Sequence, residues 1–64
     1  MYKITVIDLD QEEHEYENVS SYWFPAGGLQ LNHTDGSSTI YAPGSWLEAA
    51  VQRVDNPQSE DYQV

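Results

Sequence analysis

The sequence predicts an α+β fold, in which a small antiparallel sheet of about four strands is followed by one short C-terminal helix. Short stretches with alternating apolar residues, separated by turn residues, predict the sheet. An apolar repeat at i, i+3, i+4 and i+7 predicts the helix, and it consists of Leu47, Ala50, Val51 and Val54. At 64 residues the chain is one small domain at most, since a hydrophobic core usually needs about 50 residues or more.

The first two strands are expected over residues 2–9 and 13–19. The first is rich in β-branched residues, and Tyr2, Ile4 and Val6 occupy alternate positions. Residues 10–12 form the turn, since Asp is a common first turn residue. In the second strand every other residue is a glutamate, at positions 13, 15 and 17. The three glutamates therefore share one face, which we expect to be the solvent side.

Two further strands are expected over residues 29–33 and 39–42. Pro25-Ala26-Gly27-Gly28 interrupts the chain before the first of them. Between them, Asp35-Gly36 is a strong hairpin signal, flanked by apolar alternation on both sides. The loop from Thr34 to Ser38 is longer than the tightest two-residue turn, so we expect a bulge there.

The helix is expected to begin at a capping box, Ser45-Trp46-Leu47-Glu48, directly after Pro43-Gly44. It ends before Asn56-Pro57, because the residue before a proline avoids the helical region. Residues 1–54 are thus assigned to a β-rich domain with a C-terminal helix. Residues 55–64 show no periodicity and few apolar groups, and are assigned to a disordered acidic tail.

The composition excludes several functional classes. Eleven carboxylates oppose two basic residues, for a net charge of -9, which argues against direct binding to nucleic acid or anionic lipid. Without cysteine there is no disulfide framework and no thiolate ligand. No run of about 18 apolar residues and no signal-peptide pattern is present. We expect a cytoplasmic protein that does not contact membranes.

Six carboxylates fall within residues 8–17, and three interpretations compete for them. The simplest is a solvated strand face that maintains solubility and discourages edge-to-edge pairing. The second is a calcium-binding loop, because Asp8-x-Asp10-x-Glu12 matches the start of an EF-hand loop. The rest of the loop does not match, since Glu13 stands where Gly is required and Val19 where a bidentate Glu is required. The third is mimicry of nucleic acid, because alternate residues on a strand are ~6.6–6.8 Å apart, roughly the distance between neighbouring phosphates.

The aromatic residues also allow two interpretations. Trp23 faces one side of its strand while Tyr22 and Phe24 face the other. Either these rings form the core, or one or two of them remain exposed as anchors for a partner or a second copy of the chain. Trp46 raises the same question, because it lies off the apolar stripe of the expected helix.

No catalytic or cofactor motif is recognised. His14 and His33 are the only histidines, and a metal site built from them with a glutamate is the least favoured alternative. Gly27-Gly28 has no following Lys and matches no phosphate-binding loop. Solvated carboxylates lack the apolar surroundings that raise a pKa for general acid catalysis. We therefore expect no enzyme activity, no metal and no cofactor.

Four segments together resemble a style of tiny β-meander found among small accessory proteins of actinobacterial phages and their hosts. The segments are Ile4-Thr-Val-Ile-Asp-Leu-Asp, Glu13-His-Glu-Tyr-Glu-Asn-Val, Gly28-Leu-Gln-Leu and Asp35-Gly-Ser-Ser-Thr-Ile-Tyr. The resemblance covers about residues 3–54 and implies a strongly curved sheet with a terminal helix, encoded on or near a mobile element. Such proteins often bind and inhibit one host or rival protein, some as acidic nucleic-acid mimics. The turn at residues 10–12 and the break at residues 25–28 depart from the pattern, and no functional residue carries over.

These observations predict a non-enzymatic inhibitor that binds a basic nucleic-acid-binding protein or nuclease in the host cytoplasm. An antitoxin that blocks a basic toxin belongs to the same class. The alternative is an assembly module that self-associates, for instance as a homodimer, or docks a partner through Trp23, Phe24 and Trp46. The expected partner-binding residues are Asp8, Asp10, Glu12, Glu13, Glu15, Glu17, Trp23 and Trp46.

Overall fold

The computed structural model describes residues 1–55 and 59–63, which form one antiparallel sheet in the order β4-β3-β2-β1-β5-β6. The only helical element among these residues is a single 3-10 turn, Pro25–Gly27. No helix in the described part of the chain is long and apolar enough to cross a membrane. The strands are β1 (Tyr2–Asp8), β2 (Glu13–Trp23), β3 (Leu29–His33), β4 (Ser38–Tyr41), β5 (Trp46–Arg53) and β6 (Ser59–Gln63).

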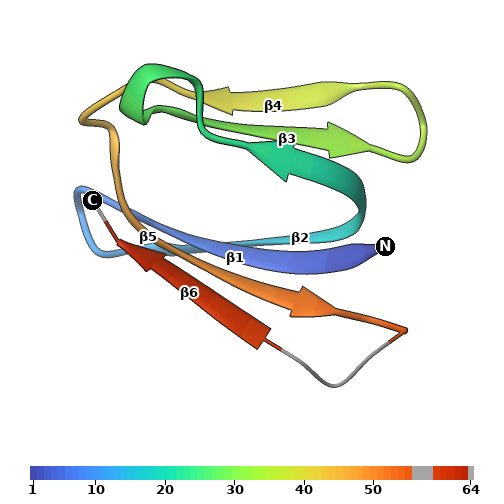
Figure 1. Ribbon diagram of the computed structural model, residues 1–64. Coiled ribbons are helices and arrows are strands. Elements are labelled where there is room, and N and C mark those ends of the chain that lie inside the picture. Colours follow the sequence, from blue (N-terminus) through green and yellow to red (C-terminus); the bar gives the residue numbers. More distant parts are fainter. Residues whose placement is uncertain (56–58, 64) are drawn as a thin grey trace.

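The sheet bends along β2 and folds over itself into two layers (Figure 1). The first half of β2 lies in the lower layer with β1, β5 and β6, and its second half lies in the upper layer with β3 and β4. The pairing of β2 shifts register against β1 and again against β3, on either side of Val19. Asn18, in the left-handed region at φ 58°, marks the first irregularity. These irregularities let one strand turn from one layer into the other.

The core lies between the layers and follows the alternation of the strands. Ile4 and Val6 of β1 are fully buried and pair with Val51 and Ala49 of β5. The complete buried set is Ile4, Val6, Val19, Leu29, Leu31, Trp46, Ala49 and Val51. Half-buried aromatic rings pack around it, namely Tyr2, Tyr16, Tyr22, Phe24, Tyr41 and Tyr62.

The four strands expected from the sequence are present and antiparallel. Asp35-Gly36 forms the hairpin turn between β3 and β4, as predicted. Gly36 adopts φ +93°, a conformation that favours glycine. The Asp35 carboxylate accepts hydrogen bonds from the amide and the hydroxyl of Ser37, at 2.9 and 2.6 Å, and these bonds lower the pKa of Asp35.

The predicted α+β class and its C-terminal helix are wrong, because residues 46–53 form strand β5. The segment carries two periodicities at once. Leu47, Ala50, Val51 and Val54 fit a helix, whereas Ala49 and Val51 fit the buried face of a strand. An isolated helix of about ten residues has marginal stability in water. The edge of β1 that does not pair with β2 offers backbone N–H and C=O groups along its whole length. Seven residues of β1 accordingly pair with β5.

The expected capping box is replaced by a turn. Ser45 donates its hydroxyl and its amide to the carbonyl of Ala42, at 2.6 and 3.1 Å, so its side chain does not cap Glu48. Pro43 and Gly44, the latter with φ +81°, occupy the two central positions. Proline followed by a residue with positive φ is the pattern of a type II turn, and it sends the chain into β5.

Ser59–Gln63, which were expected in a disordered tail, form β6 and pair with β5 from Gln52 to Glu48. Tyr62 anchors this edge strand, because its ring lies 4.8 Å from that of Phe24 and its hydroxyl 3.2 Å from that of Tyr22. Residues 56–58 and 64 of the expected tail lie outside the described residues.

Candidate functional site

The outer surface of the lower layer, which we call the acidic face, carries two groups of carboxylates. Glu13, Glu15 and Glu17 lie exposed along β2 on the side opposite to the core, as predicted. Glu48 of β5 and Asp61 of β6 lie on the same side, since they pair with Ile7 and Ala50 respectively. The other members of this face are Lys3, Thr5, Ile7, Ala50, Gln52, Ser59 and Gln63.

The outer surface of the upper layer differs sharply from the acidic face. Residues 19–33 and 38–41, which include all of its strand positions, contain no Asp or Glu. Asn32 is the centre of a neutral network, in which it donates to the Ser21 hydroxyl at 3.0 Å and accepts from Gln30 and Ser38 at 2.9 and 3.0 Å. Five of the eleven carboxylates thus lie on the outer surface of the lower layer, and none lies on the strands of the upper layer.

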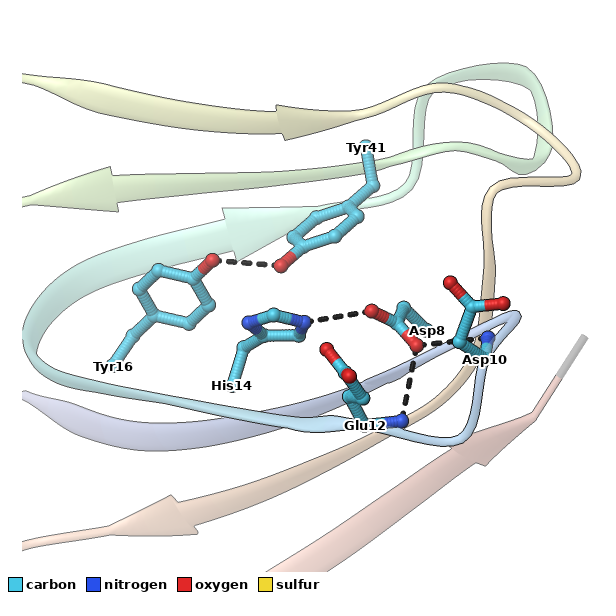
Figure 2. Close-up of polar contacts among 6 residues, drawn as sticks. All are labelled: Asp8, Asp10, Glu12, His14, Tyr16 and Tyr41. Atoms are coloured by element: carbon cyan, nitrogen blue, oxygen red, sulfur yellow. Dashed lines mark hydrogen bonds and ion pairs between the residues drawn. The ribbon is translucent and has the colours of Figure 1, made fainter.

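Asp8, Asp10 and Glu12 lie in and beside the turn between β1 and β2, at one end of the acidic face (Figure 2). Asp8 faces inward, and one of its carboxylate oxygens accepts hydrogen bonds from the backbone amides of Asp10 and Glu12, at 2.9 and 3.0 Å. The other oxygen lies 2.8 Å from His14 Nε2. This is the only contact within 4.0 Å between a carboxylate and a basic side chain among residues 1–55 and 59–63.

The hydrogen bond from His14, followed by those from the backbone amides, lowers the pKa of Asp8. The side chains of Asp8 and His14 remain 22% and 40% exposed. Ligand atoms of Asp8, Glu12 and His14 lie within 4.8 Å of one another, so these three residues could hold a divalent cation. The hydrogen bond that the Asp8 carboxylate accepts from His14 already explains why these side chains lie close together, because it links the two ends of the β1–β2 turn.

The second histidine lies elsewhere. His33 Nε2 is 2.7 Å from the hydroxyl of Thr39, and its ring packs 5.9 Å from that of Tyr16. The hydroxyl oxygens of Tyr16 and Tyr41 lie 2.7 Å apart, and this hydrogen bond joins the two layers (Figure 2). Burial, and then the hydrogen bond from Tyr16, raise the pKa of Tyr41. These contacts join β3 to β4 and the lower layer to the upper layer, and so support the fold.

The structure separates the aromatic residues that were expected to bind a partner. Trp46 is only 4% exposed, and its indole donates to the carbonyl of Gly27 at 3.2 Å. Phe24 stacks on Trp46 with the ring centroids 5.8 Å apart. Trp23 instead lies on the outer surface of the upper layer and is 53% exposed. Of the three, Trp23 alone offers most of its ring to a partner.

Sequence reasoning missed two carboxylates of the acidic face. Glu48 was assigned to the helix cap and Asp61 to the tail, so neither had a place on the sheet. No local signal identifies them, because their side of the sheet follows from the pairing of β5 with β1 and of β6 with β5. No protein-family model, no curated protein and no solved structure matches the chain.

Proposed function

We propose that this protein is a non-enzymatic inhibitor that binds a basic nucleic-acid-binding protein or nuclease through its acidic face, in the place of nucleic acid. The target belongs to the host cell or to a defence system, and binding occurs in the host cytoplasm. Encoding on a phage or mobile element, which the resemblance implies, is part of the same proposal.

The segregation of charge carries this proposal. Solubility requires exposed charge but no particular distribution of it, whereas the five carboxylates of the acidic face lie together and the upper layer has none on its strands. None of the five pairs with a described basic group within 4.0 Å. An unneutralised acidic face favours fast, salt-sensitive association with a cationic surface.

The first test is capture of a partner from host lysate on the tagged protein, washed at ~50 mM and then at ~300 mM salt, because the screening length shrinks over that range. We expect a basic nucleic-acid-binding protein that is released at the higher salt. A duplex or single-stranded oligonucleotide should compete with the inhibitor for this protein, since both would occupy the same cationic site.

The matched variants are E13Q/E15Q/E17Q and D35N/D55N/E60Q, each of which removes three negative charges. The first neutralises the row on β2, and the second neutralises carboxylates away from the acidic face, in the β3–β4 turn, after β5 and on the inward side of β6. We expect the first to lose capture and the second to keep it. Equal capture by E13Q/E15Q/E17Q and the parent would contradict the proposal, as would equal losses in both variants.

Self-association is the second candidate, and one observation favours it. Trp23 and Ile40 are 53% and 67% exposed on the outer surface of the upper layer, and both lie beside Gln30. Exposed apolar side chains next to the free edge strand β4 could seat a second copy of the chain. Sedimentation at several concentrations tests this candidate: a dimer that persists at high salt and is lost in W23S would support it.

A further inference from the structure

We propose that the segment recognised by the acidic face is a basic α-helix, held between the carboxylates of β2 and those of β5 and β6. This inference rests on the proposed function and names the kind of partner. The acidic face would then resemble a DNA major groove, which also presents two negative borders and admits one helix.

The separation of the two acidic borders matches the width of an α-helix. β2 and β6 are three strand positions apart in the sheet, which corresponds to about 14 Å at the usual strand spacing. An α-helix with its side chains is about 10–12 Å across. A helix laid between the borders would therefore bring Lys or Arg side chains on its two flanks to Glu15 on one side and to Asp61 on the other.

The surface between the two borders leaves room for a helix. Thr5 and Ala50 pair directly with each other in the middle of the face, and both have short side chains. At one end, a hollow crosses β2, β1 and β5, and its lining includes Lys3, Glu17 and Gln52. At the other end, Ile7 lies between Glu13 and Glu48 and offers an aliphatic contact. A helix can thus approach the middle of the face without a steric barrier.

The length of the contact is limited by the sheet. The row from Glu13 to Glu17 spans about 13 Å, at ~3.3 Å per residue. Neighbouring strands also rotate by about 20–25°, so a straight helix meets both borders over a short length only. About two helical turns, or roughly 11 Å, fit this length. An extended cationic chain could follow the β2 row but would not reach the second border at the same time.

The test uses two synthetic peptides of equal charge. One is a 14-residue amphipathic helix with Arg on two flanks and Ala and Leu between them, and the other replaces two central Ala residues with Pro to prevent the helix. Binding to the full chain is measured by fluorescence anisotropy at ~50 mM salt. We expect the helical peptide to bind at least about tenfold more tightly.

Protein variants locate the bound helix. E48Q/D61N and A50F should each weaken the helical peptide about tenfold, the first by removing the second border and the second by filling the middle of the face. S38F, at an exposed position on the upper layer, should bind like the parent. K3Q should bind more tightly, because it removes a positive charge from the face. Circular dichroism of each variant reports whether the fold is retained.

The two proposals fail in different ways. Equal affinity of both peptides, or unchanged binding by E48Q/D61N, would overturn the helix inference and leave the acidic face as a general cation-binding surface. Unchanged binding of both peptides by E13Q/E15Q/E17Q would overturn the acidic face itself, and with it the proposed function. No binding of either peptide to the parent would also overturn the helix inference.

Discussion

Two neighbouring alanines distinguish strand β5 from the helix that the sequence predicted. In the structure Ala49 is fully buried between Val6 and Tyr62, while Ala50 is exposed on the acidic face. In the helix the order is reversed, because Ala50 belongs to the apolar stripe and Ala49 lies beside it. We therefore compare A49K and A50K, which have the same composition and charge.

The expected free energies differ widely. A chain of 64 residues has a total stability of roughly 3–10 kcal/mol at the usual 0.05–0.15 kcal/mol per residue. Lysine at position 49 must displace packed neighbours and desolvate its ammonium group, at a cost of at least about 3 kcal/mol. Lysine at position 50 points into water and faces Asp61 across the strands, so its effect should stay within about 0.5 kcal/mol.

Urea unfolding measured by tryptophan fluorescence gives both values, because Trp46 is buried in the core. With a slope of about 1 kcal/mol per molar for a small domain, A49K should lower the midpoint by about 3 M or be unfolded from the start. A50K should unfold like the parent. If A50K is the less stable variant, or if the two are equally stable, the strand assignment and the core built on it are refuted.

Three further predictions concern pH and backbone geometry. Hydrogen bonds lower the pKa of Asp8, so the stability that Asp8 contributes is present above its unfolded pKa of about 3.9 and is lost as the pH falls below that value. In urea titrations between pH ~4 and ~2, H14F should therefore lose less stability than the parent. An unchanged pH profile would contradict this prediction. The pKa of Tyr41 is raised, so the pH dependence is reversed: the stability that Tyr41 contributes is present below pH ~10 and is lost at more alkaline pH. In thermal melts at alkaline pH, the midpoint of Y41F should fall less steeply with pH than that of the parent. G28A would place a Cβ 2.7 Å from the carbonyl oxygen of Tyr41 and should lower the free energy of unfolding by about 2 kcal/mol or more. G36A meets open space at φ +93° and should lower it by about 1 kcal/mol. A thermal midpoint for G28A at or above that of G36A would contradict this ranking.

Local signals predicted β1, β3, β4 and the first part of β2, whereas β2 continues to Trp23, beyond its predicted end at residue 19. Alternation defines each strand, and Asp35-Gly36 defines a hairpin without reference to the rest of the chain. Strand β5 could not be identified in this way, since its residues satisfy a helical and a strand period equally well. The decision depends on β1, whose buried residues Ile4 and Val6 need a pairing partner on both sides.

The candidate site was predictable to the same extent. Glu13, Glu15 and Glu17 share a face because of their spacing alone, and the structure places them there. Glu48 and Asp61 join them only through pairings between segments distant in sequence. The inward orientation of Asp8 and the burial of Trp46 likewise follow from the folding of one layer over the other.

The arrangement of the acidic face carries an energetic cost that bears on its role. Like charges at alternate positions of one strand repel each other, and Glu15 has no described cation within 4.0 Å to offset this. Moving part of this charge to the upper layer would serve solubility as well and would reduce the repulsion. Each such repulsion is small, but a domain of this size has little stability to spare. Concentrated charge therefore has no stabilising function in the isolated chain, and under the proposed function binding of a cationic partner would offset its cost.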